Sequence, residues 1–189
     1  MALVRAERIS LEKIAPVDRD KSGPFDVSEV GLLTPYLDFG SIRIAPKPEM
    51  QIRADVDEAN KRIVAITVEI NKHRMQLQAF AATRSEGLWL STLEALSKSV
   101  ADQGGESAKR SGPLGIELFA QVPNPTRNSV FVGCDGPRWF LRGVITGDDL
   151  SGANYLEMIS VFRQTVVNRG DVALPPGDLL PLKLPVGNE

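Results

Sequence analysis

A change in the spacing of apolar residues limits the fold of this chain more than any other feature. In "MQIRADVD" (50–57) apolar and polar residues alternate, and "RIVAITVEI" (62–70) is apolar on both faces. These patterns predict β-strands, the second one central in a sheet. Between residues 87 and 104 the apolar residues instead recur every three or four positions, which predicts an amphipathic helix. Its apolar stripe consists of Trp89, Leu93, Leu96 and Val100.

The remaining segments extend this alternation of strands and helices. Further strands are predicted over 36–44, 75–83, 116–123, 129–134 and 138–146, and a second helix over about 152–167. The polar segment 106–115 is expected to be a link. Because most connections are of turn length, neighbouring strands should run antiparallel. We therefore expect an α/β chain of the α+β type, with a mostly antiparallel sheet of about six to seven strands packed against two main amphipathic helices.

Composition along the chain divides it into three parts. Residues 1–34 are polar and interrupted by proline and glycine, so we expect an extended N-terminal arm. A single α+β domain should follow over 35–168. Residues 169–189 are rich in proline and are expected to form an extended tail packed on the surface.

The charge and the apolar content argue against several classes of partner. With 22 basic and 24 acidic residues the formal net charge is −2, and no basic block could neutralise a run of phosphates, so we do not expect nucleic-acid binding. No apolar stretch approaches membrane length, and the N-terminus lacks the apolar run of a signal peptide. A membrane partner is therefore not expected, and the protein is predicted to be cytoplasmic. The single cysteine fits a reducing compartment.

The residues that usually carry catalysis are scarce. The only histidine, His73, lies in a predicted turn between Lys72 and Arg74, where we expect it to be solvated, and Cys134 is expected to be a small buried hydrophobe. No glycine-rich phosphate loop opens a helix. The sequence thus predicts no catalytic residues, no metal and no cofactor. Asp148 or Asp149 is well placed to cap the second helix.

Candidate binding residues gather around residues 135–142. In the predicted strand, Arg138 and Arg142 share one face and Trp139 lies on the other, beneath a helix. Both arginines could pair with structural carboxylates or bind an anionic ligand. The ligand-binding alternative would use Arg138 and Arg142 together with the carboxylates Asp135 and Asp38, which lie at predicted element ends.

Several segments together resemble a known family. They are "GPFD" (23–26), "LQAFAATRSEGLW" (77–89), the "GG…GPLG.EL" run (104–118), "DGPRWFLRGVITG" (135–147) and "VVNRGDVALPPGDLLPLKLP" (166–185). In combination they resemble an uncharacterised actinobacterial family, DUF3710, which implies no activity. The order of strands and helices is more distantly similar to Mog1/PsbP-like domains, in which an antiparallel sheet flanked by helices acts as a binding scaffold.

Two functional hypotheses follow from the sequence. The first is a non-enzymatic cytoplasmic interaction module that binds an unknown protein partner through its sheet rim and tails, because the tail holds apolar residues that must dock somewhere. Those residues are Leu179, Leu180, Leu182 and Leu184. The alternative is an enzyme or small-ligand binder for an anionic metabolite or nucleotide.

Overall fold

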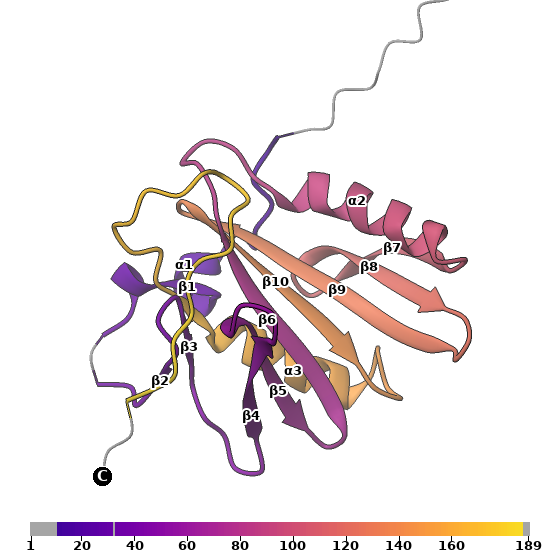
Figure 1. Ribbon diagram of the computed structural model, residues 1–189, viewed down its shortest axis with the longest axis horizontal. Helices are drawn as coiled ribbons and strands as arrows, with labels where there is room; N and C mark the ends of the chain where they lie inside the picture. Colours follow the sequence, from indigo (N-terminus) through magenta and orange to yellow (C-terminus); the bar gives the residue numbers. More distant parts are fainter. Residues whose placement is uncertain (1–10, 32, 187–189) are drawn as a thin grey trace, which may run out of the picture.

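A seven-stranded antiparallel sheet dominates the computed structural model, which describes residues 11–31 and 33–186 (Figure 1). Its strands follow the order β4-β5-β6-β10-β9-β8-β7. They are β4 (Gln51–Asp57), β5 (Arg62–Ile70), β6 (His73–Ala81), β7 (Glu106–Gly112), β8 (Gly115–Val122), β9 (Arg127–Gly136) and β10 (Trp139–Thr146). The α+β class and the mostly antiparallel sheet expected from the sequence are confirmed.

A second, four-stranded sheet of very short strands has the order β1-β11-β3-β2. Its members are β1 (Phe25–Asp26), β2 (Leu37–Asp38), β3 (Ile42–Ile44) and β11 (Val166–Val167). Strand β1 pairs in parallel with β11, so residues 25–26, which the sequence placed in an arm, join residues 166–167 in one sheet. A short helix α1 (Arg19–Ser22) and a 3-10 turn η1 (Val27–Glu29) flank β1. Residues 1–10 of the expected arm and 187–189 of the expected tail lie outside the described residues.

The two main helices, α2 (Trp89–Asp102) and α3 (Ala153–Gln164), pack on opposite faces of the large sheet (Figure 1). Trp89 of α2 contacts Phe140, whereas Phe162 of α3 belongs to the core around the neighbouring Leu141. Successive residues of a strand point to opposite faces, so the alternation in β10 separates the two helices. None of the described helices is both long and apolar enough to cross a lipid bilayer.

Strand β7 was not expected, because its sequence "ESAKRSG" is polar and lacks β-branched residues. It is one of the two edge strands of the large sheet and pairs only with β8, from Glu106 opposite Gln121 to Gly112 opposite Gly115. Helix α2 packs over β7 and β8. An edge strand needs little apolar surface, and its backbone hydrogen bonds to β8 are independent of side-chain type.

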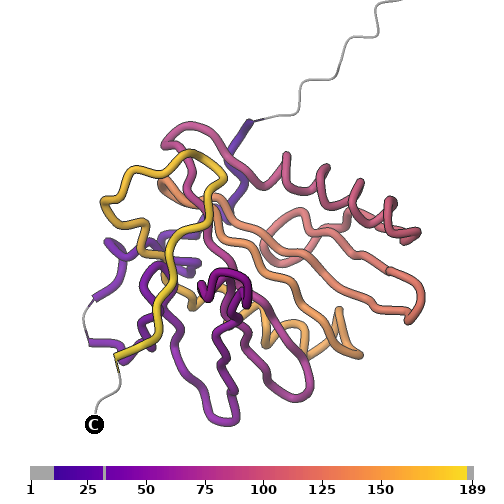
Figure 2. Tube along the Cα trace, viewed as in Figure 1, coloured from indigo at the N-terminus to yellow at the C-terminus, as the bar shows by residue number. Residues whose placement is uncertain are grey.

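The C-terminal segment lies against the chain's own strands. The yellow trace in Figure 2 passes beside the purple segment that contains residues 39–41, where Leu182 forms an isolated antiparallel β-bridge with Gly40. Two residues earlier in the sequence, the backbone N–H of Leu180 donates to the Ala79 carbonyl at 2.9 Å. Leu180 is fully buried and Leu179 and Leu182 are half-buried, whereas Leu184 is 64% exposed. Three of the four leucines that we expected to be available to a protein partner are therefore buried or half-buried against this chain.

The sequence-based placement of His73 in a solvated turn is wrong. The turn between β5 and β6 consists of Asn71 and Lys72 alone, both with positive φ, as in the two-residue hairpins that match strand twist. His73 already belongs to β6 and is 4% exposed. Its Nε2 accepts a hydrogen bond from the backbone N–H of Asp149, and its Nδ1 lies 3.1 Å from the carbonyl oxygen of Asn71. Both ring nitrogens therefore serve the fold.

The N-cap residue of α3 is Gly152 and not one of the two aspartates that the sequence suggested, but Asp149 stabilises the start of the helix from three positions before it. Its carboxylate accepts backbone N–H groups from Gly152 at 2.6 Å, Ser151 at 3.2 Å and Asn154 at 3.2 Å. These hydrogen bonds, the one from Gly152 first, lower the pKa of Asp149 below its ordinary value. The folded state consequently holds the proton more weakly than the unfolded state.

Replacing Asp149 by alanine should lower Tm at neutral pH, where the ionised carboxylate stabilises the fold. Because the folded pKa is depressed, this stabilisation is present above the unfolded pKa of about 4 and is lost as the pH falls through the folded pKa. Thermal unfolding of wild type and Asp149→Ala should thus differ at pH 7 and converge near pH 2. Asp148→Ala is the control, because Asp148 is exposed. If the difference in Tm between wild type and Asp149→Ala stays constant from pH 7 to pH 2, the ionised carboxylate of Asp149 is not the source of the stabilisation.

Candidate functional site

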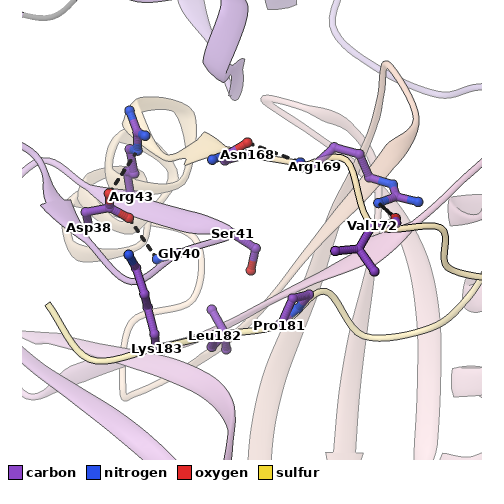
Figure 3. A pocket seen from close by; sticks show the side chains of 11 residues that line it. Asp38, Gly40, Ser41, Arg43, Asn168, Arg169, Val172, Pro181, Leu182 and Lys183 are labelled. Atoms are coloured by element: carbon purple, nitrogen blue, oxygen red, sulfur yellow. Dashed lines mark hydrogen bonds and ion pairs between the residues drawn. The ribbon is translucent and has the colours of Figure 1, made fainter.

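A pocket of about 420 Å³ lies where three distant segments meet, and we call it the tail pocket (Figure 3). The segments are residues 38–43 around the β2–β3 turn, residues 168–172 after β11, and residues 181–183 of the C-terminal segment. Lys183 is held in place because its backbone N–H donates to the Phe39 carbonyl at 2.9 Å. The pocket volume falls within the range of small-molecule sites.

The β2–β3 turn positions the first wall of the tail pocket. Asp38 accepts the backbone N–H of Gly40 at 2.8 Å, which closes a local turn of the type that aspartate favours. Gly40 has φ +89°, and a Cβ there would lie 3.3 Å from both Lys183 Cγ and the Pro181 carbonyl oxygen. Only glycine combines this backbone conformation with such a close approach of the C-terminal segment.

The loop after β11 forms the opposite wall. The backbone N–H of Asn168 donates to the Ser41 carbonyl at 2.8 Å, and the Asn168 side chain accepts the backbone N–H of Gly170 at 3.1 Å. Arg169 turns back on its own loop, where Nη1 donates to the Val172 carbonyl at 2.8 Å. Figure 3 shows Arg169 on one side of the pocket and Arg43 and Lys183 on the other, with the hydroxyl of Ser41 between them.

The lining of the tail pocket has an excess of positive charge. It contains three basic side chains, those of Arg43, Arg169 and Lys183, and one carboxylate, that of Asp38, in a chain whose formal net charge is −2. Arg43 Nε lies 3.7 Å from Asp38 Oδ2, within ion-pair range but beyond a hydrogen bond. The Nε atoms of Arg43 and Arg169 are buried and have no hydrogen-bond partner among the described residues. The guanidinium and ammonium groups of the lining favour a carboxylate or phosphate as partner.

Of the four candidate binding residues from the sequence, Asp38 lies in the tail pocket and the other three do not. Asp135, expected in a turn, is instead a buried residue of β9. Its carboxylate accepts the backbone N–H groups of Ile14 at 2.9 Å and Leu88 at 2.8 Å, and burial raises its pKa. Asp135 therefore fastens the N-terminal segment and the start of α2 to the sheet.

Arg138 and Arg142 do not share a strand face, which corrects the expectation from the sequence. The β9–β10 hairpin turns through Pro137 and Arg138, and Arg138 has φ +64°. Pro137 supplies the fixed φ of the first turn position and Arg138 takes the left-handed second position, so the strand begins only at Trp139. Arg138 is exposed at this turn, away from the tail pocket.

Arg142 does lie on β10, on the α2 side of the sheet with Phe140. Its guanidinium stacks 5.2 Å from the centroid of the Phe80 ring and donates to the side-chain oxygen of Gln78. It forms no ion pair with any carboxylate that the structure describes, its Nε lacks a hydrogen-bond partner there, and burial lowers its pKa. The aromatic ring and the amide thus stabilise this cation in place of a carboxylate.

Sequence reasoning missed Arg43, Arg169, Lys183, Ser41 and Asn168. None of them belongs to a recognisable motif, and they meet only through long-range contacts such as the one between Ser41 Oγ and the Leu180 carbonyl, 139 positions apart. One signal was available, because the segment 166–185 that carried part of the family resemblance contains Asn168, Arg169 and Lys183.

The cysteine and histidine side chains of the described residues are both buried in the fold. Cys134 is fully buried, and burial raises the pKa of its thiol to about 12, so the reactive thiolate is scarce at neutral pH. Both ring nitrogens of His73 are engaged in the fold. Within residues 11–31 and 33–186, no three His, Cys, Asp or Glu side chains gather where they could bind a metal ion.

One protein-family model matches residues 23–189, and its description is "Protein of unknown function (DUF3710)". The match includes every residue that lines the tail pocket. Neither the curated proteins nor the solved structures gave a match to the chain.

Proposed function

Since the chain belongs to the DUF3710 family of proteins of unknown function, we propose a function from its own surface: it is a non-enzymatic module that binds a small anionic ligand in the tail pocket. The observation that carries the proposal is the excess of basic side chains in the pocket lining, where Arg43, Arg169 and Lys183 gather with Asp38 as the one carboxylate. A bound carboxylate or phosphate could accept hydrogen bonds from the basic groups around the pocket.

The surroundings support binding rather than catalysis. Lys183 and Asn168 offer an ammonium and an amide to an anion. The carboxylate of Asp38 is already close to Arg43 and to the backbone N–H of Gly40, which favours a structural role for it. We place this activity in the cytoplasm, because the single cysteine of the chain fits a reducing compartment.

A protein partner stays a prediction from the sequence. The exposed residues that motivated it are fewer than expected, since Leu180 is buried and Leu179 and Leu182 are half-buried against this chain. Leu184, 64% exposed, is the tail leucine that remains open to a partner. The anionic-ligand hypothesis therefore moves from Arg138 and Arg142 to the tail pocket.

The proposal is tested by ligand-dependent thermal unfolding with inorganic phosphate, pyrophosphate and citrate at constant ionic strength. At least one of these anions should raise Tm with a saturable dependence, reaching about 2.7 kcal/mol of stabilisation at a hundred times its Kd. In Lys183→Glu the Kd should increase about tenfold to about a hundredfold, because a charge-assisted hydrogen bond is replaced by repulsion.

Lys98→Glu provides the matched control, since it makes the same charge change at an exposed position on α2, remote from the tail pocket. This variant should bind like wild type. Equal weakening in both variants would indicate attraction by net charge alone, and the absence of any saturable shift with all three anions would contradict the proposed function.

A further inference from the structure

A second hollow of about 740 Å³ adjoins the tail pocket, and we call it the tail groove. It lies between the beginning of β5 and the C-terminal segment. Aliphatic side chains or proline make up eight of its eleven lining residues, and no aromatic ring or carboxylate is among them. The aliphatic residues that matter for the argument are Ile63, Val64, Val172, Leu174, Leu179 and Leu182.

The tail groove exists because the large sheet separates at this end. Strands β5 and β6 are paired from Ile70 opposite His73 as far as Ile66 opposite Leu77. Beyond that point the side chain of Gln78 donates to the Val64 carbonyl at 3.0 Å, and the C-terminal segment pairs with β6 in place of β5. The groove is the space left between β5 and this segment.

The tail groove and the tail pocket share three lining residues, Val172, Pro181 and Leu182. Val172 at this junction is 62% exposed, although it is apolar and the loop around it is otherwise polar. A ligand seated in the tail pocket could therefore continue past Val172 into the groove. One end of the combined surface is cationic and the other aliphatic.

We propose that the ligand of the tail pocket is an amphiphile, a carboxylate or phosphate head joined to an aliphatic chain that lies in the tail groove. This inference rests on the proposed function, because the head occupies the same basic pocket. The absence of aromatic residues from the groove lining gives a nucleobase no ring to stack on, which favours an aliphatic group. Lys61 and Arg62 at the rim of the groove add to the positive charge and favour an anionic amphiphile over a neutral lipid.

The experiment measures Kd for acetate, hexanoate and decanoate, and for inorganic phosphate and decyl phosphate, by calorimetry below the micelle concentration. A buried methylene tightens binding by up to about fourfold, so decanoate should bind at least about tenfold more tightly than hexanoate. The comparison of decanoate with decyl phosphate identifies the head. Val172→Asp should abolish the dependence on chain length, and Val186→Asp is the matched control at a position that is 87% exposed and outside the groove lining.

The outcomes separate the two proposals. If phosphate or the short anions bind in a manner sensitive to Lys183→Glu but chain length has no effect, the amphiphile inference is overturned and the proposed function stands. If no anion binds in a manner sensitive to Lys183→Glu, the proposed function fails as well. If the protein instead forms a concentration-dependent dimer that buries the groove, and Kd does not depend on the chain length of the ligand, the apolar surface belongs to an interface with a second copy. The inference is then overturned.

Discussion

Replacing Trp89 by alanine is expected to lower the free energy of unfolding by about 3–5 kcal/mol, the usual cost of truncating a fully buried aromatic residue. Trp89 has no exposed surface, and its Nε1 donates to the Ile116 carbonyl at 2.9 Å. Its ring stacks on Phe140 with 5.8 Å between centroids. The indole therefore fastens α2 to the sheet by apolar burial and a hydrogen bond together.

The sheet is shaped to receive this ring. A Cβ on Gly133 of β9 would lie 2.4 Å from ring atoms of Trp89, so the indole packs directly on the bare backbone. Because Gly133 has no side chain that could fill the space, removal of the ring should leave a cavity.

Urea denaturation followed by circular dichroism measures the effect. Trp89→Phe should fall between wild type and Trp89→Ala, because it keeps a ring and loses the hydrogen bond. Leu156→Ala, at a position that is 51% exposed on α3, should change stability by less than about 0.5 kcal/mol. If the free energy of unfolding of Trp89→Ala lies within about 1 kcal/mol of the wild-type value, α2 is held to the sheet by other contacts.

The helix around Trp89 illustrates what the sequence predicts well. Its stripe of apolar residues is local and repeats with helical spacing, and α2 spans Trp89–Asp102, inside the predicted limits. The polar edge strand β7 and the two-residue strand β11 lack any such local signal, because their pairing partners determine them. Local periodicity therefore predicted both main helices and every strand of the large sheet except β7. In the four-stranded sheet it predicted one strand over 36–44, which is divided into β2 and β3, and it missed β1 and β11.

The candidate site was predictable only in part, for a related reason. Asp38 was identified because a carboxylate at a strand end is visible in the sequence. The contacts that complete the tail pocket join residues near 40 to residues near 180, and no spacing rule relates them. Arg138 was misplaced because β10 begins at Trp139, one position later than the predicted strand, so Arg138 lies in the turn and not on the face that carries Arg142.

The largest electrostatic effect is expected at a buried ion pair between β7 and β8. The Glu117 side chain is 3% exposed, and its Oε2 accepts a hydrogen bond from Arg110 Nε at 2.7 Å. The hydroxyl of Tyr155 donates to Glu117 as well, and burial, followed by this hydrogen bond, raises the pKa of Tyr155. Arg110 also donates to the Leu150 carbonyl and lies near the Phe119 and Tyr155 rings.

Arg110→Met should cost about 3–5 kcal/mol, because it leaves the buried carboxylate of Glu117 without its counter-charge. Glu117→Leu should cost less, about 2–3 kcal/mol, since Arg110 is 32% exposed and can turn toward water. Both values are measured as free energies of unfolding in urea at pH 7.

The double variant decides whether the two residues act as a pair. With Arg110→Met and Glu117→Leu combined, no charge is left buried, and the loss should be smaller than that of Arg110→Met alone. Losses that simply add would mean that Arg110 and Glu117 are stabilised independently, by Leu150 and Tyr155 rather than by each other. A sub-additive result would instead indicate that each residue is kept at this position largely because the other is there.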